Sequence, residues 1–151
     1  MRDFASLAEM RPLVGQEVAV SEWVDIDQER VNLFADATDD HQWIHVDLER
    51  SARESPFGGP IAHGFLTLSL VSSLFEKAIR MLDAKMVVNY GLNKVRFPAP
   101  VPVGSRVRAR MTLTRIEDIE GGAQLEFSVI VEREGAAKPV CVAELLLRRY
   151  P

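Results

Sequence analysis

Residues 56–79 read PFGGPIAHGFLTLSLVSSLFEKAI, and the rest of the architecture can be built around this stretch. The Pro- and Gly-rich turn at 55–60 stands directly before a long apolar run, an order that predicts a helix beginning just after the turn. Apolar residues follow a helical period over 64–82 and also fill the opposite side. We therefore expect this helix to be buried on most faces, with its first half lying deepest.

The sequence on the C-terminal side of this helix changes to a period of two, which is typical of half-buried strands. Alternation is clearest over 106–113 and over 124–131, and Gly121-Gly122 between them predicts a hairpin. Further strands are expected at 86–97 and 140–147, and an edge-like first strand at 18–23. The pattern predicts an α+β fold, with an antiparallel sheet of about five strands around one long apolar helix.

A short amphipathic helix is predicted between the first strand and the apolar helix. Asp25 and Asp27 offer N-cap carboxylates before residues 28–37, where apolar side chains share one face. The C-terminal end of this helix delivers Asp39 and Asp40. The residues that follow have no sustained period and are expected to form a loop.

Size and composition restrict the class of protein. A chain of 151 residues fits a single domain over 1–151, and 47% hydrophobic with 26% charged residues is typical of a globular protein. A net charge of -4 argues against nucleic acid as a partner. The single Cys141 favours a reducing compartment, and no signal peptide or membrane span is evident, so we expect a cytoplasmic protein without a membrane partner.

Asp40 and His45 are the first candidates for chemistry. They stand five residues apart across a helix end and a loop, where chain reversal can turn a carboxylate and an imidazole toward one point. A histidine that titrates near neutral pH and a carboxylate can together take a proton from water and return one to carbon. The spacing alone is weak, because aspartate and histidine in loops more often cap helices or lie on the surface.

The start of the apolar helix is the second candidate. Gly64 follows a Gly-rich turn, and the free N–H groups of a helix N-terminus can hold an anion such as a developing enolate. The same glycines also suit tight turns and close packing. His63, the preceding residue, fits a structural role better than direct catalysis.

Three motifs in this order resemble the MaoC-like, or hydratase 2, family. They are FADATDDHQWIHVD at 34–47, PFGGPIAHG at 56–64 and NYGLNKVRFPAPVPVG at 89–104, and the resemblance spans nearly the whole chain. The sequence is most similar to the family's single-domain mycobacterial-type (R)-hydratases, in which His-Gln-Trp replaces the commoner x-Asn-Pro after the aspartate. The replacement of the Asn-Pro pair bears on the substrate preference more than on the reaction chemistry.

The resemblance implies a hot-dog fold, a homodimer with sheets joined side by side, and an acyl-CoA thioester substrate. Family members are (R)-specific enoyl-CoA hydratases, which add water reversibly to trans-2-enoyl-CoA to give (R)-3-hydroxyacyl-CoA. The resemblance further implies that Asp40 and His45 hold and activate the water, and that the Gly64 N–H faces the thioester oxygen. No cofactor and no metal is expected.

Other residues within or near these motifs are weaker candidates. Substrate contacts are predicted for four side chains, Gln42, His63, Asn89 and Arg96. Arginines at 106, 108 and 110 share one strand face, as do Lys94 and Arg96 on another, and either group suits coenzyme A phosphates or, more simply, a solvated surface. Asp39 departs from the family, in which glycine usually precedes the aspartate, so we expect Asp39 to point to solvent and its backbone to tolerate a non-glycine residue.

Two alternatives to the hydratase remain open from the sequence. The first is a hot-dog acyl-CoA thioesterase, which also needs a carboxylate, a helix N-terminus and an acyl tunnel. The second is a non-catalytic acyl-CoA-binding or dehydratase-partner subunit. The Asp-x4-His spacing favours the hydratase over the thioesterase, and an intact Asp40 and His45 pair argues against a silent subunit.

Overall fold

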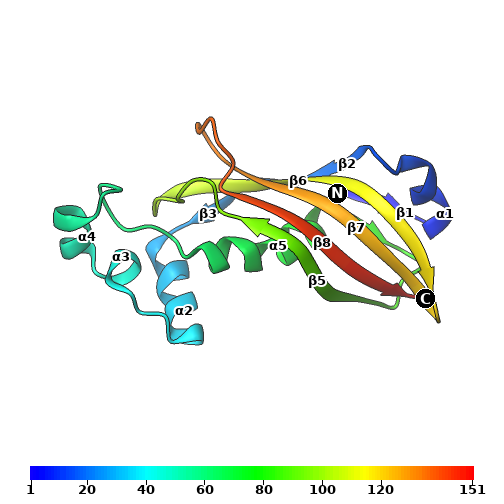
Figure 1. Ribbon diagram of the computed structural model, residues 1–151, viewed down its shortest axis with the longest axis horizontal. Helices are drawn as coiled ribbons and strands as arrows, with labels where there is room; N and C mark the ends of the chain where they lie inside the picture. The colour runs from blue at the N-terminus through cyan, green and yellow to red at the C-terminus, as the bar shows by residue number, and fades with distance from the viewer.

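A curved antiparallel sheet wraps around the long helix α5 (Gly64–Ala78) in the computed structural model, which describes residues 1–151 (Figure 1). The sheet has six strands in the order β2-β6-β7-β8-β5, with β3 also paired to β6. Its strands are β2 (Glu17–Val20), β3 (Val24–Ile26), β5 (Met86–Arg96), β6 (Ser105–Ile119), β7 (Gly122–Arg133) and β8 (Cys141–Tyr150). The predicted α+β class is confirmed, and the arrangement is that of a hot-dog fold.

The core lies between α5 and the concave face of the sheet. Alternate residues of β6 and β7 are fully buried, as their period of two predicted, and Leu113 pairs with Phe127 across the two strands. Phe127 meets Phe75 of α5 edge to face, with ring centroids 5.0 Å apart. Cys141 is buried in the same core, and burial raises the pKa of its thiol to about 11, so this thiol stays protonated and inert.

Helix α5 is shorter and less completely covered than its apolar sequence predicted. It ends at Ala78, because residues 79–81 form the strand β4 (Ile79–Met81), which pairs in parallel with β1 (Arg2–Phe4) at the N-terminus. Phe65, in its first turn, is 68% exposed, so the expectation of burial on most faces is wrong for the isolated chain. The first half is nevertheless buried at Leu66, Thr67, Leu70 and Val71. One face packs on the sheet, and the other face is left uncovered by this chain.

The N-terminal segment closes the end of the sheet where α5 ends. It contains β1, α1 (Leu7–Met10) and the 3₁₀ helix η1 (Arg11–Leu13), none of which the hydrophobic pattern indicated. Asp83, just after β4, accepts the Leu7 N–H through its carboxylate and forms an ion pair with Arg149 of β8 at 2.7 Å. The Arg149 side chain is only 8% exposed. This ion pair therefore ties three segments together in a largely dry environment.

Removing the Asp83 carboxylate is expected to destabilise the protein. The substitution Asp83→Ala leaves the buried Arg149 guanidinium without its partner, which is expected to cost about 2 to 4 kcal/mol of unfolding free energy. Urea unfolding followed by circular dichroism measures this value. Asp118→Ala is the matched control, because its ion pair with Arg11 is solvent-exposed and contributes less than about 1 kcal/mol. Equal losses in both variants would contradict the assignment.

The helices α2 (Gln28–Thr38), α3 (Trp43–Val46) and α4 (Leu48–Glu54) gather at the other end of the molecule, beyond the sheet (Figure 1). The Asp27 carboxylate caps α2 by accepting the Arg30 N–H at 2.8 Å, as predicted. The loop expected after Asp40 is wrong, because it contains α3 and α4. Helices of four and seven residues are too short to show a hydrophobic period.

The predicted first strand is also divided. Its regular pairing stops at Val20, where the Ser21 hydroxyl takes over as the acceptor for the Ala109 N–H. A separate strand, β3, starts at Val24. Every helix in the structure is too short or too polar to span a membrane.

Candidate active site

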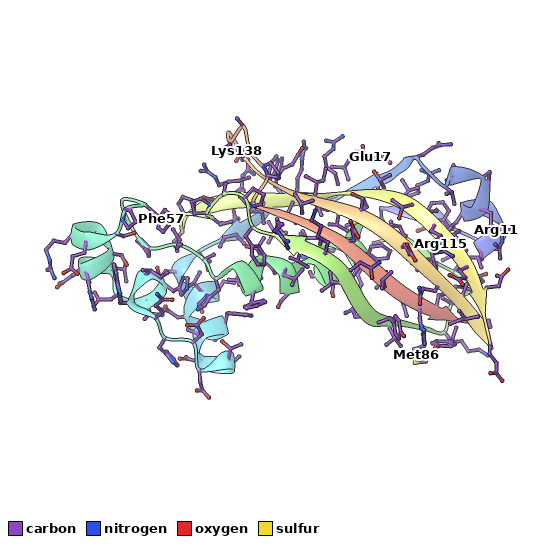
Figure 2. The ribbon with its side chains drawn as sticks, viewed as in Figure 1. Arg11, Glu17, Phe57, Met86, Arg115 and Lys138 are labelled. Carbon is purple, nitrogen blue, oxygen red and sulfur yellow. The ribbon has the colours of Figure 1, made fainter.

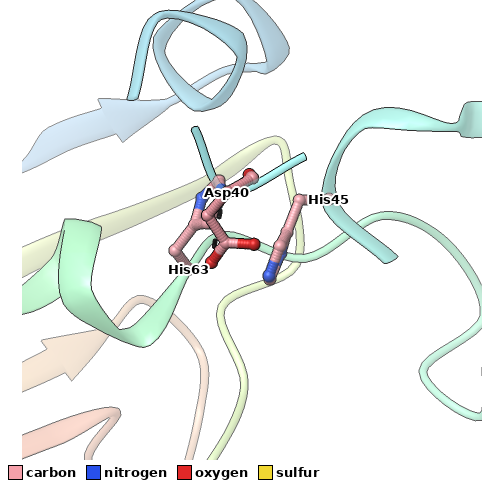
Figure 3. Close-up of side chains that lie close together, drawn as sticks. All are labelled: Asp40, His45 and His63. Atoms are coloured by element: carbon pink, nitrogen blue, oxygen red, sulfur yellow. Dashed lines mark hydrogen bonds and ion pairs between the residues drawn. The ribbon is translucent and has the colours of Figure 1, made fainter. Parts of the chain in front are cut away.

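Asp40, His45 and His63 meet at the end of the molecule where α2, α3 and α5 approach one another. Asp40 follows the C-terminus of α2, His45 lies in α3, and His63 is the N-cap residue of α5. Figure 3 shows the Asp40 carboxylate turned toward the His45 ring, with His63 beside both. One polar atom from each side chain lies within 4.8 Å of the others. The structure thus brings together the two residues that the sequence predicted as a pair.

The His45 ring is held in one orientation by a backbone carbonyl. Its Nδ1 lies 2.6 Å from the Ile61 carbonyl oxygen, and the side chain is buried. A carbonyl oxygen only accepts, so Nδ1 carries the proton, and in the neutral ring Nε2 keeps its lone pair. The Gln28 side chain also donates to the His45 carbonyl at 2.8 Å, which fixes the main chain. His45 is thereby arranged as a proton acceptor at Nε2.

Burial is the main influence on the His45 pKa. It lowers this pKa below the ordinary value of 6.5, because the imidazolium loses solvation, and the neighbouring His63 lowers it further. The hydrogen bond to Ile61 and the Asp40 carboxylate act in the opposite direction and only partly offset the loss. His45 is consequently neutral, and able to accept a proton, at physiological pH.

The Asp40 carboxylate reaches this position through a left-handed residue. Asp39 ends α2 at φ 58°, the only non-glycine residue of the chain with positive φ, and aspartate tolerates this region better than most residues. Asp39 itself is exposed, as predicted. One Asp40 oxygen accepts the Gln42 N–H at 3.4 Å, and the side chain remains 48% exposed. Asp40 can therefore meet a ligand that enters from solvent.

Gly64 begins α5 beside this pair. Neither the Gly64 N–H nor the Phe65 N–H has a backbone acceptor in the chain, so both remain free at the positive end of the helix. A Cβ at Gly64 would lie 3.1 Å from the Phe97 ring. The glycine therefore allows Phe97, at the end of β5, to pack closely against the helix start.

A cavity of about 460 Å³ opens at the same place, large enough for part of a small ligand. Its lining includes His45 and Gly64, and the rest is mainly apolar: Ile44, Phe57, Ile61, Ala62, Thr67, Phe97, Pro98, Ala99, Pro100, Val101 and Val140. A second cavity, of about 330 Å³, includes Met86 at the far end of α5. Figure 2 shows Phe57 and Met86 at opposite ends of the molecule. Of the candidate pair, His45 lines the first cavity, whereas Asp40 does not.

The three side chains are better arranged for proton transfer than for metal binding. The rings of His45 and His63 are stacked, with centroids 3.8 Å apart and planes at 25°. Lone pairs that lie in nearly parallel rings do not converge on one ion, and one nitrogen of each ring already faces a carbonyl oxygen. The stacking therefore favours proton transfer over coordination of an ion by both rings.

The other predicted substrate contacts lie apart from the cavity. The Gln42 side chain is exposed at the start of α3, and Asn89 donates to the Ser72 hydroxyl at 3.0 Å on another part of α5. Arg96 is exposed and donates to the carbonyl of Val95. None of the three lines the cavity beside His45. Their roles in substrate binding stay predictions.

The arginines of β6 form ion pairs along their own sheet face. Each bonds a glutamate of a neighbouring segment at 2.6 to 2.8 Å: Arg106 with Glu134, Arg108 with Glu132 and Arg110 with Glu17. The guanidinium of Arg108 also lies over the Trp23 ring. These contacts favour the interpretation as a solvated strand face.

Three groups of the site were not identified from the sequence. They are the Ile61 carbonyl, the Gln28 amide and the Phe97 ring. A main-chain carbonyl leaves no trace in residue identity, so Ile61 carried no signal. Phe97 stands inside the third motif, and its position before Pro98 at the end of a predicted strand was the available clue.

The fold and this site define the chain as a hot-dog protein with an aspartate and a histidine side by side near the N-terminus of its central helix. The model of the MaoC like domain family matches residues 9–134. The chain is 56% identical over 149 residues to 3-hydroxyacyl-thioester dehydratase Z of Mycobacterium tuberculosis, covering 98% of each.

Two solved structures are also similar. The MaoC-like dehydratase from Rhodospirillum rubrum has a TM-score of 0.76 at 21% identity, covering 98% of this chain and 99% of that chain. The (R)-hydratase from A. caviae involved in PHA biosynthesis has a TM-score of 0.70 at 25% identity, covering 91% and 96%. The chain belongs to the MaoC-like dehydratase family, and it is a hydro-lyase.

Proposed function

We propose that the protein is an (R)-specific enoyl-CoA hydratase that interconverts trans-2-enoyl-CoA and (R)-3-hydroxyacyl-CoA. The observation that carries the proposal is the His45 ring, with a proton on Nδ1 and a free lone pair on Nε2, next to the Asp40 carboxylate and the start of α5. The names of the mycobacterial dehydratase and of the (R)-hydratase from A. caviae support the thioester substrate and the stereochemistry.

The water molecule is activated by the pair. His45 Nε2 takes one proton from the water as the water oxygen bonds to C3 of the enoyl group. The Asp40 carboxylate accepts a hydrogen bond from the other O–H of the water and stabilises the imidazolium. The imidazolium then returns a proton to C2, so that water is added across the double bond and the enzyme is regenerated. The same groups, used in reverse, remove water from the hydroxyacyl thioester.

The negative charge that develops during the addition is carried by the thioester oxygen. The free N–H of Gly64 and the positive end of α5 are fixed before the substrate arrives, so they stabilise this enolate-like charge without reorganisation. The apolar lining around Phe97 keeps bulk water from the reacting carbons and strengthens the interaction.

The direct test is hydration of crotonyl-CoA, followed by loss of enoyl absorbance and by chiral analysis of the product. We expect (R)-3-hydroxybutyryl-CoA and no free thiol. Release of coenzyme A thiol would instead favour the thioesterase. Binding of crotonyl-CoA without either reaction would favour the silent partner subunit.

The activity is expected to depend on pH in the direction set by His45. Its neutral form accepts the proton, so kcat/KM for hydration should rise with pH as His45 loses its proton. Because burial lowers this pKa, the midpoint of the acidic limb should lie below 6.5. A pH-rate profile with crotonyl-CoA measures it. A midpoint clearly above 6.5 would contradict the role of a buried neutral imidazole.

We also propose a homodimer joined through β5. This strand is the edge of the sheet, pairs only with β8, and leaves five large apolar side chains exposed: Met86, Val87, Val88, Tyr90 and Leu92. An apolar edge strand of eleven residues is a site for pairing with another sheet.

Leu92→Lys is expected to give a monomer, because an ammonium group at this edge resists burial in the interface. Light scattering with size-exclusion chromatography distinguishes the 16.9 kDa chain from its dimer. Val20→Lys, on the opposite edge strand β2, is the matched control and should remain dimeric. A wild-type monomer would refute the proposal.

A further inference from the structure

His63 is the one titratable side chain of the site that the reaction does not use. Its side chain is 2% exposed and therefore shielded from an entering ligand, unlike the Asp40 side chain, which is 48% exposed. Its polar atoms nevertheless lie next to both members of the candidate pair. A buried imidazole at this place requires an explanation, because burying polar atoms costs free energy unless they form contacts.

The first contact of His63 is with the main chain of Asp40. The His63 Nε2–H donates to the Asp40 carbonyl oxygen at 2.9 Å, across 23 residues of sequence. Asp40 otherwise lies on an exposed turn after the left-handed Asp39. Its carboxylate accepts the weak local bond from the Gln42 N–H, and its Oδ2 lies 4.0 Å from His63 Nε2. The His63 hydrogen bond is therefore the tie that fastens the Asp40 turn to the start of α5.

The second contact is with the ring of His45. The two imidazoles stack with centroids 3.8 Å apart, and Phe34 of α2 packs on His63 at 4.9 Å. The Ile61 carbonyl, two residues before His63, holds the edge of the same His45 ring. One short segment of chain, 61–63, thus fixes His45 by its face and by its edge.

The protonation of His63 follows from its surroundings. Nε2 must carry the proton, because it faces a carbonyl oxygen, whereas Nδ1 is buried and has no partner. A proton on Nδ1 would create an unsatisfied buried donor beside the stacked His45 ring. His63 is consequently arranged to hold its neighbours and not to pass protons between them.

We propose that His63 is a positioning residue that holds the Asp40 turn through its Nε2–H and the His45 ring through stacking, without touching the substrate. The inference rests on the proposed hydratase function, for which Asp40 and His45 must face the same water molecule. Positions of reacting groups matter strongly, since a displacement of about 1 Å can cost about 100-fold in rate.

The kinetic test compares two substitutions of the same residue. His63→Phe keeps a flat ring for stacking and loses the donor, whereas His63→Gln keeps an N–H at the reach of Nε2. With crotonyl-CoA we expect His63→Phe to lower kcat about 100-fold with little change in KM. The kcat of His63→Gln should be about tenfold higher than that of His63→Phe, because the hydrogen bond to Asp40 is retained. His41→Gln, which changes an exposed histidine, is the control and should behave as wild type.

A spectroscopic readout tests the contact independently of turnover. The carbonyl ¹³C resonance of Asp40 should shift in His63→Phe, where its hydrogen bond is lost, and should return toward the wild-type value in His63→Gln. Full kcat in His63→Phe, equal losses in both variants, or an unshifted Asp40 carbonyl would each overturn the inference. A wild-type protein that leaves crotonyl-CoA unchanged would refute the hydratase proposal instead, while the Asp40 resonance would still decide the role of His63.

Discussion

Asp40→Asn is expected to lower kcat for crotonyl-CoA hydration by about 100-fold to 10,000-fold, the range that one acid/base group contributes. The amide has nearly the shape of the carboxylate and can still accept the Gln42 N–H. It loses the negative charge that stabilises the His45 imidazolium when the water proton is transferred. The effect should therefore fall on kcat more than on KM, which initial rates over a range of crotonyl-CoA concentrations would measure.

The neighbouring residue supplies the control for this substitution. Asp39→Asn changes the same functional group one position earlier, and asparagine also tolerates the left-handed conformation at φ 58°. Asp39 is exposed, so this variant should keep wild-type activity and stability. A folded Asp40→Asn protein with normal turnover would remove the mechanism.

His45→Gln is expected to lower kcat by a similar factor of about 100-fold to 10,000-fold, because glutamine has no lone pair of comparable basicity to take the water proton. Its amide N–H can replace part of the bond to the Ile61 carbonyl, so the loss of activity should exceed the loss of stability. Thermal unfolding measured beside the kinetics separates the two effects. Binding of butyryl-CoA, which lacks the double bond, should be nearly unchanged.

The double variant adds a second criterion. In the proposed mechanism Asp40 and His45 act on one water molecule, so combining their substitutions should cost much less than the product of the single losses. His41→Gln is the matched control for the histidine, since its ring is exposed and forms an ion pair with Asp36. Fully multiplicative losses would indicate that the two residues serve separate steps.

The sequence predicted the parts of this molecule that obey a regular period. Strands β6 and β7 follow from alternation, and the hairpin between them turns at Glu120 and Gly121, next to the predicted Gly121-Gly122 pair. Helix α2 follows from the Asp27 cap and its apolar face. Residues 79–81 were misassigned because their apolar spacing suits a helix, yet the N-terminal strand β1 pairs with them. That choice depends on a partner far away in sequence, which local periodicity does not contain.

The candidate site was predictable in its residue types but not in its connections. Asp40, His45 and Gly64 could be selected because their chemistry and motif positions agree. The bond from His45 to the Ile61 carbonyl and the stacking of His63 depend on how α3 and α5 approach each other. Neither contact leaves a pattern in the sequence, because one uses a main-chain atom and the other joins residues 18 positions apart.

The helical end of the molecule has a consequence for cooperative unfolding. Helices α2, α3 and α4 lie beyond the sheet. Hydrogen bonds to the 61–63 segment and from Gln28, together with the buried Val31 of α2, hold them around the site. Such a unit can open while the long ladder of β6, β7 and β8 stays intact. Amide hydrogens around Asp40 and His45 should therefore exchange through a subglobal opening, and the enzyme can lose its competent site while most of its structure persists.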